Sequence, residues 1–150
     1  PNTPEVRMSN TITEPLEPKG MQRLRSSARR EAGKRGLDFY LSIHSIHGAE
    51  VNVSSGMIQG NHVLGYQIFP NGERRPFRGV HLRGNNCSIL DSFESFGNVT
   101  QERHGECDSD SGLIPITEVA PWAFSRGIEL HGLVDPYTQE TDGRKRYLFL

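Results

Sequence analysis

The residues most able to do chemistry lie around a cysteine in the stretch GNNCSILDSFESFG, residues 84–97. Cys87 directly follows two asparagines and directly precedes a segment with helix-like spacing of apolar residues. The start of a helix stabilises a thiolate through its dipole and its unpaired backbone N–H groups. This pattern is typical of a nucleophilic thiol, and also of a small buried cysteine at the start of a helix.

A thiol nucleophile needs a base, and His131, in the strand-like segment ELHGLV, can supply one. Asn86, or Asn85 beside it, can cap the helix or donate a hydrogen bond to a developing oxyanion. Asp142 lies eleven residues after His131, in a predicted turn from which its carboxylate can orient the imidazole. These residues predict a Cys–His dyad that hydrolyses or transfers an amide bond. The substrate would be a peptide or another amide, and no cofactor is expected.

The order of these residues resembles that of the papain-like thiol hydrolases, a superfamily that includes the NlpC/P60 peptidoglycan peptidases and viral leader proteases. The resemblance covers residues 84–150: an Asn–Cys pair that opens an amphipathic helix, a histidine on a short strand, and then HGLV…DGRKRYLFL. It implies Cys87 as nucleophile, His131 as base and Asp142 as a candidate third member. The chain departs from the family at Ser88, where the family has a bulky residue or a glycine.

A second candidate site is the basic segment KGMQRLRSSARREAGKR, residues 19–35, which contains only one acid, Glu31. Such a segment is typical of a solvated or disordered arm, and also of a surface that binds the phosphates of nucleic acid. It has no aromatic residue, so it gives no support for base stacking. The residues expected to contact nucleic acid are Arg23, Arg25, Arg29, Arg30, Lys34 and Arg35.

The alternative to an enzyme is therefore a non-enzymatic subunit, viral or structural, that binds nucleic acid or an assembly partner through residues 19–35. A third hypothesis comes from FRGVHLRG, residues 77–84, which resembles the strand that opens the NAD site of mono-ADP-ribosyltransferases, with Arg78 as its arginine. The segment IPIT, residues 114–117, does not match the Ser-Thr-Ser strand of that family.

Two pairs of residues have the short spacing of zinc ligands: His44 with His47, and His104 with Cys107. Residues three apart in a strand point to opposite faces, so the first pair converges only if a turn follows. Exposed histidines that flank a turn are the alternative, and we expect no metal.

The composition predicts one soluble domain. The chain has 150 residues, 34% of them hydrophobic and 23% charged, with 16 glycines, 9 prolines and a net charge of −1. No apolar run is long enough to span a membrane. Two cysteines make no disulfide framework, although one bridge between them is conceivable. Three N-x-S/T sequons, at Asn52, Asn86 and Asn98, favour a secretory route without fixing the compartment.

The elements that must position these residues fall into two parts. Residues 1–36 are expected to form an extended, proline-rich and basic arm, in which the spacing of Met21, Leu24 and Ala28 allows a short helix. Residues 37–150 are expected to form a single α+β domain.

Within that domain, alternating apolar residues predict strands over 37–46, 49–53, 62–69 and 77–84, with a hairpin turn at Asn71-Gly72. Leu90, Phe93 and Phe96 predict a helix from Ser88 to Phe96. A polar loop over 98–112 should follow, and two strands, in GIELHGLV and RKRYLFL, should close the fold. The expected fold is thus an antiparallel sheet with one central helix.

Overall fold

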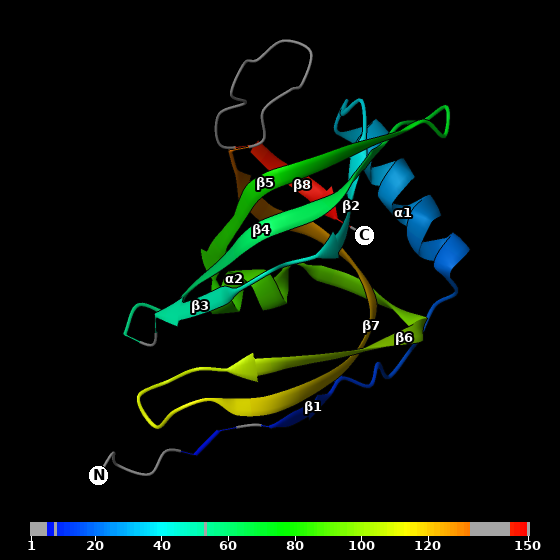
Figure 1. Ribbon diagram of the computed structural model, residues 1–150. Helices are drawn as coiled ribbons and strands as arrows, with labels where there is room; N and C mark the ends of the chain where they lie inside the picture. Colours follow the sequence, from blue (N-terminus) through cyan, green and yellow to red (C-terminus); the bar gives the residue numbers. More distant parts are fainter. Residues whose placement is uncertain (1–5, 8, 53, 133–144, 150) are drawn as a thin grey trace.

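The chain folds around one β-sheet that contains both parallel and antiparallel pairs (Figure 1). The computed structural model describes residues 6, 7, 9–52 and 54–132, and it describes 145–149 as backbone. The helices and strands, in chain order, are β1 Asn10–Ile12, α1 Met21–Lys34, β2 Tyr40–Ser45, β3 Ala49–Asn52, β4 Met57–Ile68, β5 Arg74–Asn85, α2 Asn86–Asp91, β6 Phe93–Cys107, β7 Ile114–His131 and β8 Lys145–Phe149.

Five of these strands close into a ring. The order β7-β5-β4-β2-β8 returns to its start because β8 pairs with β2 on one side and with β7 on the other. The inward side chains of β2, β4, β5 and β7 form a buried apolar cluster: Leu41, Val63, Val80, Leu82, Ile128 and Leu130. This cluster is the main hydrophobic core.

The remaining strands extend the sheet beyond the ring. The first half of β7 leaves the ring and pairs antiparallel with β6, from Phe93↔Ser125 to Cys107↔Ile114. The short strand β1 adds in parallel to the other edge of β7. In Figure 1, β1, β6 and the first part of β7 form the lower layer, and β3, β4 and β5 lie above them.

The helix α1 covers the outer face of the ring, on the right in Figure 1. Leu24, Ala28 and Ala32 lie along one side of it and are almost fully buried, together with Tyr40 of β2 and Phe124 of β7. This second cluster is separated from the main core by the sheet itself. Alternation along β2 makes the separation possible, because Leu41 points into the ring while Tyr40 points toward α1.

Several predicted elements are confirmed. The apolar spacing of Met21, Leu24 and Ala28 does form a helix, and strands are present over parts of 37–46, 49–53, 62–69 and 77–84. The hairpin turn is also present: Gly72 has φ 88°, a value that glycine tolerates best, and the Asn71 side chain accepts a hydrogen bond from the backbone of Glu73 at 2.9 Å.

The expected fold class, α+β with an antiparallel sheet and one central helix, is wrong. The structure is mostly β, and its sheet is mixed, since β1–β7 and β2–β8 are parallel pairs. The predicted extended arm is also wrong for residues 21–34, because the helix there packs into the second cluster.

The prediction for residues 88–112 is wrong over most of its length. The helix α2 ends at Asp91, and β6 takes up the rest of the predicted helix and the predicted polar loop as far as Cys107. Leu90, assigned to an apolar stripe, is 68% exposed. The three-residue spacing of Leu90, Phe93 and Phe96 does not mark a helix here. Phe93 and Phe96 belong to a strand, with ring centroids 5.5 Å apart. No helix in the described ranges is long and apolar enough to cross a membrane.

Candidate functional site

Two arginines of the predicted basic segment contribute to a pocket between α1 and the sheet, which we call the arginine pocket. Its volume is about 180 Å³. Its cationic side chains are those of Arg25 and Arg29 on α1 and Arg74 at the start of β5. The other residues that line it are Met21, Tyr40, Ser42, His44, Tyr66, Ile68, Gly72 and Trp122.

The register of three strands explains why Arg74 joins the two helical arginines. Tyr40 of β2 lies opposite Ile68 of β4, and Ile68 lies opposite Arg74 of β5. Directly opposed residues share a face of the sheet, so Tyr40, Ile68 and Arg74 form a row on the face that α1 covers. The tight turn at Gly72 brings the chain back in this register.

The helix periodicity explains which basic side chains enter the pocket. At about 100° per residue, Arg25 and Arg29 border the buried stripe of Leu24, Ala28 and Ala32. Arg23, Arg30 and Lys34 fall on the opposite side of α1. Arg25 and Arg29 are exposed as these three are, so the direction around the helix separates the two groups rather than burial. Arg35 is the C-cap residue that follows α1; it pairs with Glu31 at 3.1 Å and donates to the backbone carbonyl of Arg126 at 3.1 Å. The predicted set of six is thus split: two residues enter the pocket and four do not.

The positive charges of all three pocket arginines act on the hydroxyl of one buried residue, Tyr40. Tyr40 is 4% exposed. Burial raises the pKa of Tyr40, and the positive charges of Arg29, Arg25 and Arg74 act in the opposite direction. Tyr40 therefore stays protonated at neutral pH and can donate a hydrogen bond.

In the described ranges, no carboxylate pairs with these cations. Among the residues that the structure describes, Arg25, Arg29 and Arg74 form no ion pair. Three guanidinium groups without an acid, next to a buried hydroxyl donor, form a site with strong preference for an anion.

Aromatic rings adjoin the cationic groups. The His44 ring makes edge-to-face contacts with Tyr66, at a centroid distance of 5.2 Å, and with Trp122, at 5.4 Å. Burial, followed by the charges of Arg74 and Arg103, lowers the pKa of His44 from its ordinary 6.5. At neutral pH this ring is therefore uncharged, and Tyr66 remains 37% exposed beside the pocket.

Cys87 lies at the start of α2, as predicted, but its side chain faces solvent. The side chains of Asn85 and Asn86 both accept hydrogen bonds from the Cys87 backbone N–H, at 3.0 and 2.7 Å. Both asparagine oxygens thus act as caps. The cavity beside α2 is lined by Ser88 rather than by Cys87. The cysteine is free and exposed.

His131 is not brought to Cys87. His131 lies opposite His81 on β5, and Asn85 is four residues further along that strand, or about 13 Å at the usual rise. The His131 ring lies 3.9 Å from the Glu129 carboxylate, and no hydrogen bond joins Cys87 and His131 in the described part of the chain. Asp142 lies outside the described residues. The predicted dyad therefore lacks the contact that a proton transfer requires.

The two zinc-like pairs do not converge either. The ring nitrogens of His44 and His47 lie near the hydroxyls of Ser42 and Ser45, and the His104 ring lies between Thr117 and Glu102. Across the described ranges, no cluster of three or more His, Cys, Asp or Glu is placed to hold a metal.

Sequence reasoning missed Arg74, Tyr40, Tyr66 and Trp122, which come from four separate strands. The available signal was the turn sequence PNGERR, residues 70–75: its hairpin places Arg74 two residues past the turn and opposite Ile68, whose neighbour on the other side is Tyr40. No known protein family, curated protein or solved structure matches this chain. Its function is therefore inferred from the geometry of its own residues.

Proposed function

We propose that this protein is a non-enzymatic subunit that binds single-stranded nucleic acid, with the arginine pocket as the main point of contact. The observation that supports the proposal is that Arg25, Arg29 and Arg74 line one pocket with Tyr40 and act on its hydroxyl, with no ion pair to an acid among the described residues. Phosphate oxygens are preferred ligands of guanidinium groups, especially where two or three guanidinium groups lie together.

The adjoining rings favour nucleic acid over another polyanion. Single-stranded sites combine cationic grooves with aromatic surfaces on which bases stack. Tyr66 and Trp122 lie beside the arginines, although the basic segment itself has no aromatic residue. A base that follows the bound phosphate could therefore stack on the exposed Tyr66 ring. An acidic polypeptide partner would use the arginines without using the rings.

The experiment measures the binding of a fluorescent oligothymidine strand as a function of salt. Each phosphate contact on a single strand contributes about 0.7 to the slope of log K against log salt concentration. The variant Arg25→Ala/Arg29→Ala/Arg74→Ala should therefore lower the slope by about 2 and weaken binding at least tenfold at moderate salt.

A matched control removes the same charge from the exposed side of α1. Arg23→Ala/Arg30→Ala/Lys34→Ala should reduce the salt slope by less than half as much, because these side chains lie outside the pocket. If affinity and salt slope fall equally in the two triple variants, the effect comes from net charge alone, and the proposed site is overturned. A wild-type affinity that does not change with salt would overturn nucleic-acid binding itself.

A further inference from the structure

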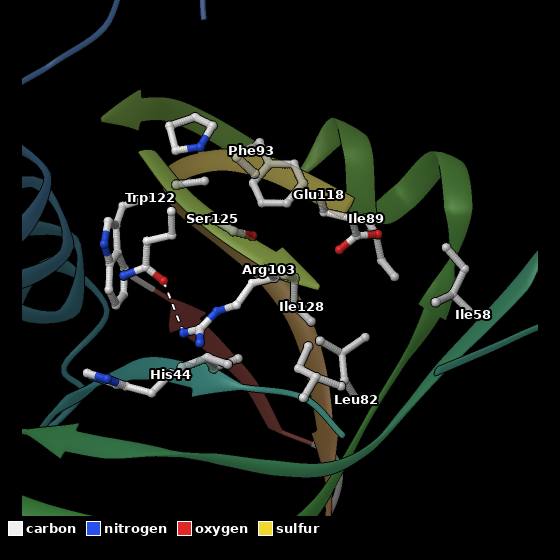
Figure 2. Close-up of a pocket in the computed structure, with 16 residues that line it drawn as sticks. His44, Ile58, Leu82, Ile89, Phe93, Arg103, Glu118, Trp122, Ser125 and Ile128 are labelled. Carbon is white, nitrogen blue, oxygen red and sulfur yellow. Dashed lines mark hydrogen bonds between the residues drawn. The ribbon is translucent and has the colours of Figure 1, made fainter. Parts of the chain in front are cut away.

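A second, larger cavity lies between the ring and the β6–β7 extension, and most of its wall is apolar (Figure 2). Its volume is about 420 Å³, which falls within the range of about 300–1,000 Å³ typical of small-molecule sites. Apolar side chains from β4, β5, α2, β6 and β7 form its wall, among them Ile58, Leu82, Ile89, Phe93 and Ile128. Figure 2 shows these side chains around a common space.

One cation reaches into this apolar space. The side chain of Arg103 extends from β6 across the cavity, and its Nη2 donates to Gln101 at 3.2 Å (Figure 2). Glu118 is the cross-strand neighbour of Arg103, but the two do not form an ion pair. In Figure 2 the Glu118 carboxylate lies on the side of Ile89, whereas the guanidinium group points toward Trp122 and His44.

The wall also contains a buried hydroxyl, which already has a hydrogen-bond partner. Ser125, which is 1% exposed, shares a hydrogen bond of 2.7 Å with Ser92. A guanidinium group that bonds only to a neutral amide has donors to spare for a carboxylate. The wall thus combines an apolar surface with one cation that forms no ion pair with any described residue.

We infer that this cavity binds an amphiphilic carboxylate, a medium-chain fatty acid or a ligand of that class. Its hydrocarbon chain would lie against Leu82, Ile89, Phe93 and Ile128, and its carboxylate would pair with Arg103. The position of Glu118 fixes the orientation, because it repels an anionic group from the Ile89 side. The head of the ligand would therefore face the wall formed by His44 and Trp122, which the cavity shares with the arginine pocket.

The test titrates the full chain with octanoate, decanoate and dodecanoate, and with decanol as the neutral analogue. Trp122 is the single tryptophan of the chain and lines the cavity, so its fluorescence reports occupancy. Each added methylene should tighten binding about threefold to fourfold until the cavity is full. Arg103→Gln should weaken decanoate at least tenfold and leave decanol unchanged.

Two further variants check the location. Arg83→Gln is the matched control for the cation, since Arg83 makes a similar bond to Gln59 at 3.1 Å but lies outside the cavity. Ala123→Phe fills the cavity and should abolish binding, whereas Ala49→Phe, on the exposed strand β3, should not.

The inference is overturned if no carboxylate gives saturable binding, or if decanoate binds equally well to wild type and Arg103→Gln. It is separate from nucleic-acid binding, because the variant Arg25→Ala/Arg29→Ala/Arg74→Ala should keep its affinity for decanoate. If the wild-type protein binds decanoate but no oligonucleotide, only the proposal for the arginine pocket is overturned.

Discussion

At the scale of single residues, Tyr40 connects the packing of the molecule to its candidate site. Its ring is part of the buried cluster under α1, and its hydroxyl lies within the field of Arg29, Arg25 and Arg74. The tyrosine therefore has two separable roles: the ring stabilises the fold, and the hydroxyl can donate to an anion.

Tyr40→Phe separates these two roles. The change keeps the ring, so we expect thermal unfolding close to that of wild type. A hydrogen bond to a charged group contributes about 1.5–3 kcal/mol, so oligonucleotide affinity should fall about tenfold or more. Undiminished affinity in a folded Tyr40→Phe protein would remove the hydroxyl from the site.

His44 provides a prediction on pH. Burial and the charges of Arg74 and Arg103 lower its pKa in the folded protein below the ordinary 6.5. Just below pH 6.5, the unfolded state therefore binds more protons at this residue than the folded state does, and stability falls as the pH falls. In His44→Gln, the decrease of the melting temperature on acidification should be smaller than in wild type. Identical pH profiles for the two proteins would contradict this expectation.

At the scale of elements, the sequence predicts those with one buried face. Strand β2 is recognisable because Leu41 and Ile43 alternate with polar residues, and α1 is recognisable because Leu24 and Ala28 have helical spacing. In such elements, the spacing of apolar residues along the segment itself indicates which side chains are buried. Roughly the strands of the ring and the helix α1 could therefore be expected from the sequence.

Strand β6 and the first half of β7, which lie outside the ring, could not be recognised from such spacing. Residues 98–106 are exposed apart from Gln101, so both faces of β6 are polar and the pattern is that of a loop. Its partner β7 contains Pro115 and Pro121, which lack the N–H group of a regular ladder and argue against a strand. The pairing register between β6 and β7 decides this part of the fold. The pattern of residues within one segment does not reveal that register.

A pair of leucines tests the assignment of helices. Leu24 on α1 is fully buried, so Leu24→Ala should lower the free energy of unfolding by about 2–5 kcal/mol. Leu90 on α2 is 68% exposed, so Leu90→Ala should change it by less than about 0.5 kcal/mol. Denaturant titration of both variants gives the comparison. Similar losses in both would mean that the apolar stripe 90–93–96 is buried after all.

At the scale of the whole molecule, the pairing of strands decides which predicted site residues meet. Closure of the ring places His131 opposite His81, away from the end of β5 where α2 and Cys87 begin. The same closure places Arg74 beside Tyr40 and under α1. The sequence contained the reactive residue types of both sites, but only the register shows that the arginines converge and that the cysteine and histidine do not.

Alkylation tests the separation of Cys87 from His131. In a Cys107→Ser background, the rate at which iodoacetamide labels Cys87 should be the same with and without His131→Ala, because no contact joins the two side chains. Mass spectrometry of the labelled peptide gives the rate. A clear slowing in His131→Ala would restore the proposal of a thiol hydrolase.

The most direct measurement of the central claim is photo-crosslinking of a 5-iodouracil oligonucleotide, with the linked residues identified by mass spectrometry. Binding at the arginine pocket predicts crosslinks at Tyr66 and Trp122, whose rings border the three arginines. These crosslinks should disappear in Arg25→Ala/Arg29→Ala/Arg74→Ala and persist in Arg23→Ala/Arg30→Ala/Lys34→Ala. Crosslinks confined to other surfaces of the protein would contradict the account.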